Sequence, residues 1–351
     1  MIKVLTVIGA RPQFIKAAAV SKEISKNTTI EEVIVHTGQH FDKNMSDIFF
    51  SELGIPAPKY QLNISSLSHG AMTGRMLESI EEVILIEKPN FLLVYGDTNS
   101  TLAGALAAKK LHVKVIHIES GLRSFNDKMP EEINRKLTDK ISDILFCSSE
   151  TSIKQLKKEG IVKGVFNSGD VMQDAVELFS KYTNKQKEKE KDNYILATIH
   201  RAENTDNKKI LSEIFIALNK INENKKVVMP IHPRTRKIVD DLGIEVNFEL
   251  KEPVGYIEML GLIGNSDLVI TDSGGLQKEA YFKNKNCVVV RNETEWDELV
   301  ECGYNKLVGT NKENIIKAVF TEFEKITNFN IYGDGNASKL IIKKIIEESN
   351  C

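Results

Sequence analysis

Carboxylates stand at three places in this sequence where chemistry could be done. Asp97 and Glu119 follow two short β-branched runs, and Glu131 belongs to the segment MPEEINR at residues 129–135. A module that only binds an anion would gain nothing from carboxylates there, because like charges repel. The three carboxylates therefore indicate proton transfer by general acid–base groups, or recognition of sugar hydroxyls. We expect the adjacent Glu132 to lie on a helix surface, where either glutamate could interact with the helix dipole.

Cations and glycines suited to an anion follow two other runs. Arg11 and Lys16 come after the first run, beside the start of a helical pattern, which favours phosphate. The segment Ser273-Gly274-Gly275 precedes a second helical stretch, and its glycines would let backbone amides approach a pyrophosphate closely. Simpler interpretations stay open, since the first segment could be a plain strand-to-helix turn and the second a plain N-cap.

Two histidines, His200 and His232, also stand at the ends of predicted strands. Each could be structural or catalytic, and the neighbouring Arg201, Arg234 and Arg236 favour an anion-binding site in which a histidine charge is useful. Neither histidine has the close spacing to a second ligand that metal motifs require, so we expect no metal. The sequence also lacks the P-loop and GxGxxG fingerprints, so we expect no nicotinamide cofactor.

Length and composition limit the class of protein. The 351 residues predict two domains, and the 41% hydrophobic and 27% charged fractions are ordinary for a globular protein. A net charge of −2, from 47 basic and 49 acidic residues, argues against a nucleic-acid partner. No apolar run approaches about 18 residues, so we expect no membrane span. Four widely spaced cysteines without a CxxC pair indicate reduced thiols, some buried in strands, and we expect a cytoplasmic protein.

Short β-branched runs alternate with helical patterns along the chain, which predicts a doubly wound α/β fold in each half. Ligands of such sheets bind beyond the carboxyl ends of the strands, so two facing sheets would bring the polar groups to one cleft. Residues 181–192 are nearly devoid of apolar side chains and predict a linker, and residues 337–348 predict a final amphipathic helix. The predicted strands are 3–8, 33–36, 91–96, 113–118, 144–147 and 165–167 in the first half, and 194–199, 227–231, 246–250, 268–271, 288–291 and 307–309 in the second.

Ten segments, spread over the chain, resemble the non-hydrolysing UDP-N-acetylglucosamine 2-epimerase family. They are GARPQFIK (9–16), TGQH (37–40), GDT (96–98), HIESGLR (117–123), MPEEINR (129–135), HRAEN (200–204), HPRT (232–235), TDSGGLQKEA (271–280), RNETE (291–295) and YGDGNAS (332–338). The resemblance implies a GT-B-like α/β fold of two Rossmann-like doubly wound parallel-sheet domains with the active site in the cleft between them. It also implies a homodimer without a cofactor.

The resemblance further implies a division of the chain and a set of site residues. We expect an N-terminal domain at 1–175 with a C-terminal helix at 336–351 packing back on it, a linker at 176–192, and a UDP-binding domain at 193–335. The implied catalytic acids and bases are Asp97, Glu119, Glu131 and His200. The implied contacts to the UDP-sugar are Arg11, Lys16, Arg123, His232, Arg234, Ser273, Gly274, Gly275, Glu279 and Arg291, with Glu279 on the ribose hydroxyls.

Two segments depart from the pattern of many UDP-N-acetylglucosamine enzymes, which carry TRPE and TERPE where this chain has ARPQ at residues 10–13 and TEWDE at residues 294–298. Both segments, like residues 169–174, resemble the subgroup that acts on UDP-2,3-diacetamido-2,3-dideoxy-glucuronate. Trp296 could contact the substrate or serve packing. Members activated by a second UDP-sugar carry a glutamine at the position of Asp42, so the resemblance does not imply that regulation here.

The activity implied by the resemblance is inversion of C2 in a UDP-2-acetamido sugar, for surface polysaccharide or glycan precursor synthesis. The substrate would be UDP-N-acetylglucosamine or the diacetamido-glucuronate. Because C2 is not next to a carbonyl, simple enolisation is unavailable, which leaves anti elimination of UDP to a 2-acetamidoglycal and re-addition. Two alternatives stay open: a GT-B glycosyltransferase that uses a UDP-sugar donor, and a nucleotide-sugar sensor without catalytic activity.

Overall fold

The structure is a computed structural model that describes residues 1–39, 53–183, 193–324, 326 and 330–349. Asp42, Cys351 and residues 184–192 of the expected linker lie outside the described residues, as does His40 of the TGQH segment. The chain forms two compact units. Unit 1 comprises Met1–Leu178 and Asn330–Cys351, and unit 2 comprises Phe179–Phe329.

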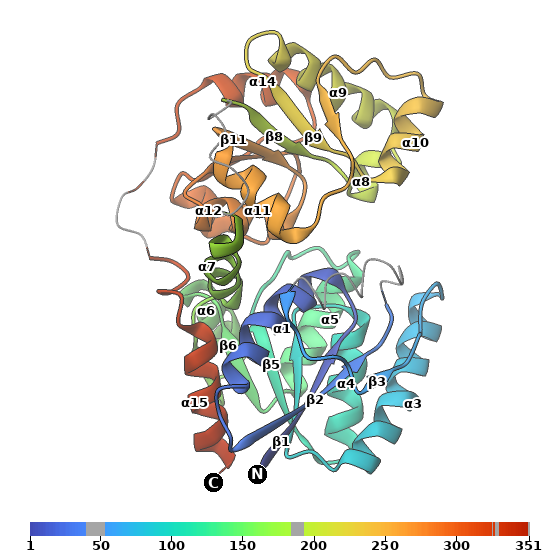
Figure 1. Ribbon diagram of the computed structural model, residues 1–351, viewed down its shortest axis with the longest axis vertical. Helices are drawn as coiled ribbons and strands as arrows, with labels where there is room; N and C mark the ends of the chain where they lie inside the picture. The colour runs from blue at the N-terminus through green and yellow to red at the C-terminus, as the bar shows by residue number, and fades with distance from the viewer. Residues whose placement is uncertain (40–52, 184–192, 325, 327–329, 350–351) are drawn as a thin grey trace. The chain divides into compact units, whose positions relative to one another are not determined.

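Unit 1 is built on a parallel sheet whose seven described strands follow the order β3-β2-β1-β4-β5-β6-β7 (Figure 1). Parallel neighbours need crossover connections, and helices supply most of them. The strands are β1 (Ile2–Ile8), β2 (Ile30–His36), β3 (Tyr60–Gln61), β4 (Phe91–Tyr95), β5 (Lys114–Ser120), β6 (Ile144–Cys147) and β7 (Val165–Asn167). The helices are α1 (Arg11–Ile24), α3 (His69–Glu87), α4 (Asn99–Lys110), α5 (Pro130–Ile141), α6 (Glu150–Lys158), α7 (Val171–Thr183), which continues into unit 2, and α15 (Ala337–Ser349).

Unit 2 repeats the architecture with a parallel sheet in the order β10-β9-β8-β11-β12-β13. Its strands are β8 (Ile195–Thr198), β9 (Val227–Pro230), β10 (Glu249–Lys251), β11 (Leu268–Thr271), β12 (Asn286–Val289) and β13 (Asn305–Leu307). Its helices are α8 (Ala202–Thr205), α9 (Lys208–Asn222), α10 (Pro233–Asp241), α11 (Tyr256–Asn265), α12 (Gly274–Phe282), α13 (Asp297–Glu301) and α14 (Lys312–Phe320).

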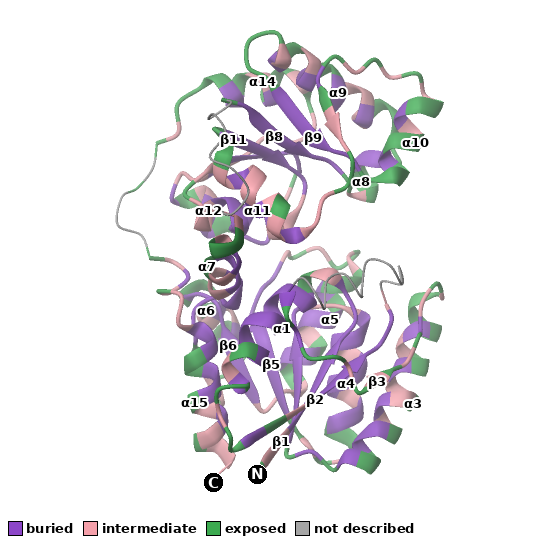
Figure 2. Cartoon of the chain, in the orientation of Figure 1, coloured by how far each residue is buried: buried purple, intermediate pink, exposed green. Residues whose placement is uncertain are grey.

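The predicted doubly wound α/β fold is confirmed in both units. Each predicted strand overlaps an observed one, and the purple strands of Figure 2 show how completely the central ones are buried. The strand that the sequence did not predict is β3, because two residues at the edge of a sheet leave no β-branched run. Strands β4, β8 and β11 are buried along their whole length, as strands covered on both faces must be.

Small residues bring α4 close to the sheet of unit 1. Ala103 and Ala107 are fully buried, and a Cβ added to Gly104 would lie 3.2 Å from Val94 and 3.4 Å from Val7. The N-terminus of α4 is capped by Thr98, whose hydroxyl accepts a hydrogen bond from the backbone of Thr101. The position of α4 therefore fixes the turn that joins it to β4.

The last helix, α15, belongs to unit 1 and packs against α1. The predicted apolar face is largely confirmed, since Ile341, Ile342 and Ile345 are buried, whereas Ile346 is half-buried. The carboxylate of Asp174 in α7 caps the helix by accepting hydrogen bonds from the backbone of Ala337 at 3.1 Å and Ser338 at 2.7 Å.

The three described cysteines are free and buried. Cys147 lies in β6 and Cys287 in β12, as the sequence predicts for thiols buried in strands, and burial raises the pKa of the Cys147 thiol to about 12. Among the described residues, no helix is long and apolar enough to cross a membrane.

Candidate active site

Each sheet has a point at which the chain changes direction, and such points are where parallel sheets bind ligands. In unit 1 this point lies between β1 and β4, because β1 leads outward to β2 and β4 leads to β5 on the other side. In unit 2 it lies between β8 and β11 for the same reason. The loops after these strands carry many of the residues that the sequence singled out.

Glu119 occupies a bulge at the end of β5. The register between β5 and β6 shifts between Ile118 and Ser120, and Glu119 adopts a left-handed φ of 69°. That conformation costs a non-glycine residue on the order of 1 kcal/mol, and bulges commonly redirect a side chain beside an active site. Here the bulge directs the Glu119 carboxylate to the ammonium of Lys16 on α1, and the two form a buried ion pair.

The Lys16–Glu119 pair lies beside Gly96, the first residue after β4. A Cβ added to Gly96 would lie 3.3 Å from Oε2 of Glu119 and 3.7 Å from Nζ of Lys16, and its φ of 64° is left-handed. A side chain at this position would be both strained and crowded. The glycine thus lets the turn before Asp97 approach the ion pair closely.

Asp97 is held by a cation as well. Its carboxylate, 28% exposed, accepts a hydrogen bond from Nη2 of Arg135 on α5. Nη1 of the same guanidinium lies 3.0 Å from Oε2 of Glu132. Asn134 of α5 also donates to the backbone carbonyl of Asp97 at 2.9 Å. Asp97 and Glu119 are therefore two carboxylates at neighbouring strand ends, each paired with its own cation.

The two glutamates at the start of α5 differ in burial, and the prediction for Glu132 is wrong. Glu132 is fully buried rather than on the helix surface, and its carboxylate accepts hydrogen bonds from the backbone of Ser124 at 2.9 Å and Phe125 at 3.2 Å. Glu131, the expected catalytic residue, is exposed in the first turn, where its negative charge suits the helix dipole. Glu131 and Glu132 are adjacent in the first turn of α5, and Arg135 follows about one turn later.

Arg123 is engaged in a buried network. Its guanidinium is 1% exposed, donates to Asp139 at 2.7 Å and makes two hydrogen bonds, at 2.8 and 2.6 Å, to Glu159. Burial alone would lower the pKa of Arg123, but the carboxylates of Glu159 and Asp139 raise it above its ordinary value. The structure thus places Arg123 in a buried ion-pair network, and its expected contact with the diphosphate stays a prediction.

Two buried side chains that the sequence did not single out hold the loops of unit 1. His117 of β5 connects Asp139 to the carbonyl of Gly96, with both distances 2.8 Å. Gln13 of α1 accepts from the backbone of Gly9 at 2.8 Å and donates to the carbonyl of Tyr95 at 2.9 Å, so it ties the ends of β1 and β4 together. Arg11 is half-buried at the first position of α1.

In unit 2, Asp272 organises the loop that carries His200. The fully buried carboxylate accepts hydrogen bonds from the backbone of His200 and Arg201, the latter at 3.0 Å, and from Asn204 at 3.0 Å. Oδ1 of Asp272 lies 3.3 Å from Nδ1 of His200, whose side chain is 51% exposed. The imidazole is therefore oriented by a buried carboxylate while its outer edge faces solvent, as a proton donor or acceptor requires.

Ser273, Gly274 and Gly275 form the start of α12, with Ser273 as the N-cap. Neither glycine has a positive φ, so backbone conformation does not demand them. A Cβ added to Gly275 would meet only the Ser273 hydroxyl, at 4.0 Å. The space beside Gly275 is thus open, whereas a Cβ added to Gly274 would lie 3.5 Å from both Oε2 of Glu295 and Nε1 of Trp296. A helix N-terminus with an accessible amide suits an anion.

The remaining predicted residues of unit 2 fall into an exposed and a buried group. His232 caps α10 by accepting from the backbone of Arg234 at 3.2 Å, and both side chains are exposed, with Arg234 paired to Asp206. By contrast, Arg291 is 2% and Glu279 5% exposed. Arg291 donates to Glu295 at 2.9 Å.

Trp296 is 5% exposed, and its indole N–H donates to the carbonyl of Gly274 at 3.0 Å. Of the two alternatives that the sequence left open, this burial favours packing over substrate contact. The tryptophan still touches the first residue of α12, so its packing bears on the N-terminus of that helix.

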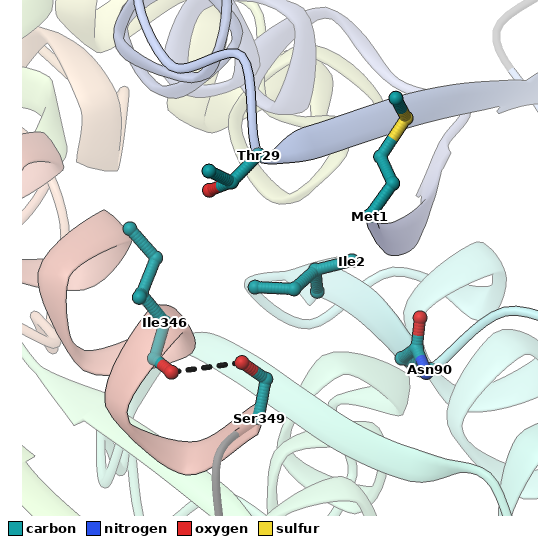
Figure 3. A pocket seen from close by; sticks show the side chains of 6 residues that line it. All are labelled: Met1, Ile2, Thr29, Asn90, Ile346 and Ser349. Atoms are coloured by element: carbon teal, nitrogen blue, oxygen red, sulfur yellow. Dashed lines mark hydrogen bonds between the residues drawn. The ribbon is translucent and has the colours of Figure 1, made fainter.

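A hollow of unit 1 lies away from these groups. It has a volume of about 390 Å³ and lies at the start of β1 and the end of α15, lined by Met1, Ile2, Thr29, Asn90, Ile346 and Ser349 (Figure 3). Its lining holds no ionisable side chain. Within the described part of the chain, no group of three or more His, Cys, Asp or Glu side chains is arranged to hold a metal ion.

Known proteins resemble this chain over nearly its whole length. The model of the UDP-N-acetylglucosamine 2-epimerase family matches residues 22–346. A UDP-2,3-diacetamido-2,3-dideoxy-D-glucuronate 2-epimerase of Pseudomonas aeruginosa is 56% identical over 346 residues, which cover 97% of this chain and 98% of that protein.

Solved structures agree as well. The UDP-GlcNAc 2-epimerase of Methanocaldococcus jannaschii in complex with UDP-GlcNAc and UDP superposes with a TM-score of 0.90 at 42% identity, over 99% of this chain and 100% of that one. The enzyme of Neisseria meningitidis bound to UDP-GlcNAc gives a TM-score of 0.89 at 33% identity, over 99% and 100% of the two chains. The GT-B-like fold class is thereby confirmed, and the chain belongs to the UDP-N-acetylglucosamine 2-epimerase family of isomerases.

Proposed function

We propose that this epimerase inverts C2 of a UDP-2-acetamido sugar, with UDP-2,3-diacetamido-2,3-dideoxy-glucuronate as its preferred substrate and UDP-N-acetylglucosamine as the second candidate. The observation that carries the acid–base role is the bulge at Glu119, which pairs that carboxylate with Lys16 beside Gly96. The preference for the uronate is supported by the 56% identity to the Pseudomonas aeruginosa enzyme.

The proposed reaction is elimination followed by re-addition. A carboxylate takes the proton from C2, the C1–O bond to the diphosphate breaks, and UDP leaves with the bonding electrons, which gives a 2-acetamidoglycal. UDP then adds back to C1 while C2 receives a proton on the opposite face. Asp97, Glu119 and Glu131 are the groups that move the C2 proton, and general acid–base catalysis of this kind contributes about 10²–10⁴-fold in rate.

The proposed binding of UDP uses groups of unit 2, His200 among them. The amides of Gly274 and Gly275 at the N-terminus of α12 bind the diphosphate, with open space beside Gly275. His200, His232 and Arg234 stabilise the departing UDP, for which their exposure is suitable. Glu279 takes the ribose hydroxyls, and Arg11 is a further proposed contact to the UDP-sugar.

The buried arginines receive a different proposed role. Because Arg123 and Arg291 are already paired with buried carboxylates, we assign them to positioning the loops rather than to direct contact with phosphate. Lys16 likewise acts through the Glu119 carboxylate with which it is paired.

We further propose a homodimer in the cytoplasm that supplies precursors of surface polysaccharide. Support for a partner surface comes from α5, where Ile133 and Leu137 are 49% and 48% exposed. Together with Phe125 at 69% exposure, these side chains leave apolar area that a second copy would cover. Light scattering of the purified protein at several concentrations tests the oligomeric state.

The substrate is tested by offering both UDP-sugars in parallel and following the C2 epimers by NMR. We expect the diacetamido-glucuronate to reach an equilibrium of gluco and manno epimers at a higher kcat/KM than UDP-N-acetylglucosamine. A faster conversion of UDP-N-acetylglucosamine would reverse the substrate assignment. Conversion of neither, with transfer of the sugar to an added acceptor, would replace the epimerase by a glycosyltransferase.

A further inference from the structure

Trp296, the only tryptophan of the chain, packs against the first turns of α12. Its indole N–H donates to the carbonyl of Gly274 at 3.0 Å. The ammonium of Lys278, a residue that is 1% exposed, lies 4.1 Å from the centroid of the Trp296 rings. Trp296 thus touches two residues that are one helical turn apart on the same face of α12.

The hydrogen bond to the carbonyl of Gly274 also orients the N–H of Gly275, which points in the opposite direction. In a trans peptide unit the carbonyl and the following N–H lie on opposite sides of the bond. Holding the carbonyl of Gly274 therefore fixes the direction of the N–H of Gly275. Gly275 is the residue above which the structure leaves open space, since an added Cβ there would meet only the Ser273 hydroxyl at 4.0 Å.

The ammonium of Lys278 completes the arrangement. A cation over an indole face is attracted by the ring, so Lys278 favours the ring orientation in which Nε1 meets Gly274. The same positive charge lies in the second turn of α12 and adds to the field of the helix N-terminus, which attracts anions.

We propose that Trp296, backed by Lys278, is a positioning residue that aims the Gly275 amide at the diphosphate of the UDP-sugar. This inference rests on the proposed function, which puts the diphosphate at the N-terminus of α12. Trp296 does not touch the substrate in this account. It acts through the Gly274–Gly275 peptide, so its fluorescence should change when a diphosphate binds to that peptide.

The test combines UDP affinity with tryptophan emission. Calorimetry gives the Kd for UDP of the wild-type protein, of Trp296→Phe, which keeps an aromatic ring but loses the N–H, and of Lys278→Met. Lys306→Met is the matched control, because Lys306 lies 4.0 Å from the ring centroid of Phe323 in the same unit but not on α12. Emission of the wild type and of Lys278→Met is followed during titration with UDP.

We expect Trp296→Phe to bind UDP about tenfold more weakly, because the Gly275 amide is no longer aimed at the diphosphate and one hydrogen bond to it is lost. Lys306→Met should keep the wild-type Kd. Wild-type emission should change saturably, at the concentration that calorimetry gives for the Kd. A wild-type Kd in Trp296→Phe would overturn the inference. Should that variant not fold, unchanged wild-type emission at saturating UDP would overturn it, and a saturable change would support it. Absence of UDP binding by the wild type would instead contradict the proposed function itself.

Discussion

His117 and Asp139 are fully buried in unit 1, with 2.8 Å between Nδ1 of the imidazole and Oδ1 of the carboxylate. The other ring nitrogen, Nε2, lies 2.8 Å from the carbonyl of Gly96, the residue before Asp97. A carbonyl and a carboxylate are both hydrogen-bond acceptors, so each ring nitrogen of His117 faces one acceptor. The ring therefore links α5 to the turn that carries Asp97.

Replacing His117 by phenylalanine should loosen that turn. The variant keeps a planar ring of similar size but leaves the Gly96 carbonyl and one oxygen of Asp139 without their partner. We expect the free energy of unfolding to fall by about 2–3 kcal/mol and kcat to fall more than KM rises, since UDP is proposed to bind groups of unit 2. Thermal melts and steady-state kinetics measure both effects. An unchanged melting temperature would contradict the positioning role.

Glu131 and Glu132 allow a contrast between neighbouring residues. Glu132→Gln replaces a buried carboxylate that pairs with Arg135 and accepts from the Ser124 backbone, so the protein should be destabilised by about 1–3 kcal/mol. Glu131→Gln removes an exposed charge from the first turn of α5 and should lower the free energy of unfolding by less than about 1 kcal/mol. The proposed acid–base role predicts a loss of about 10²–10⁴-fold in kcat. A large drop in stability for Glu131→Gln with normal turnover would reverse the assignment.

Gly275→Ala should lower affinity without lowering stability. An added methyl group meets only the Ser273 hydroxyl at 4.0 Å, and alanine favours a helix by about 1 kcal/mol over glycine. We expect an equal or higher melting temperature and a Kd for UDP weakened by about tenfold, because the methyl group occupies the approach to the amides. Gly104→Ala is the control, since its Cβ would lie 3.2 Å from Val94 and should reduce stability instead. Wild-type UDP affinity in Gly275→Ala would exclude this end of α12 as the diphosphate site.

Glu87 should make part of the stability of unit 1 depend on pH. Hydrogen bonds from Lys59, Tyr60 and Lys3 lower the pKa of Glu87 to about 2. A carboxyl whose pKa is lower in the folded state stabilises above its unfolded pKa, and that contribution is lost as pH falls toward the folded value. Glu87→Gln should therefore melt a few degrees lower than the wild type at pH 7, with the difference shrinking as pH falls from about 5 to 3. A difference that stays constant over this range would contradict the account.

The alternation of strands and helices was predictable because buried parallel strands need continuous β-branched runs, as in β4 and β11. The burial of side chains on α5 was not predictable, because charged residues face the interior of this helix packing and apolar ones face outward. Glu132, Arg135 and Asp139 are buried, while Ile133 and Leu137 are about half exposed. An amphipathic pattern predicts the opposite, so sequence reasoning put Glu132 on the surface.

In the candidate site, too, some features were predictable from the sequence and others were not. The sequence identified residue types at strand ends, such as Glu119 and His200, because their position follows from the topology of parallel sheets. It did not show that Arg123 is already paired with Asp139 and Glu159, which lie 16 and 36 residues away. Pairings between side chains of segments far apart in the sequence depend on packing, which local patterns do not encode.

The central claim, that C2 loses and regains a proton at the groups of unit 1, is tested most directly by turnover in D₂O. The enzyme is incubated with UDP-2,3-diacetamido-2,3-dideoxy-glucuronate, and with UDP-N-acetylglucosamine in parallel, and the C2 position of the product is read by NMR. Our account predicts deuterium at C2 of the epimerised sugar, and a rate of incorporation that falls strongly in Asp97→Asn. An epimerised product that retains the original proton at C2 would contradict it.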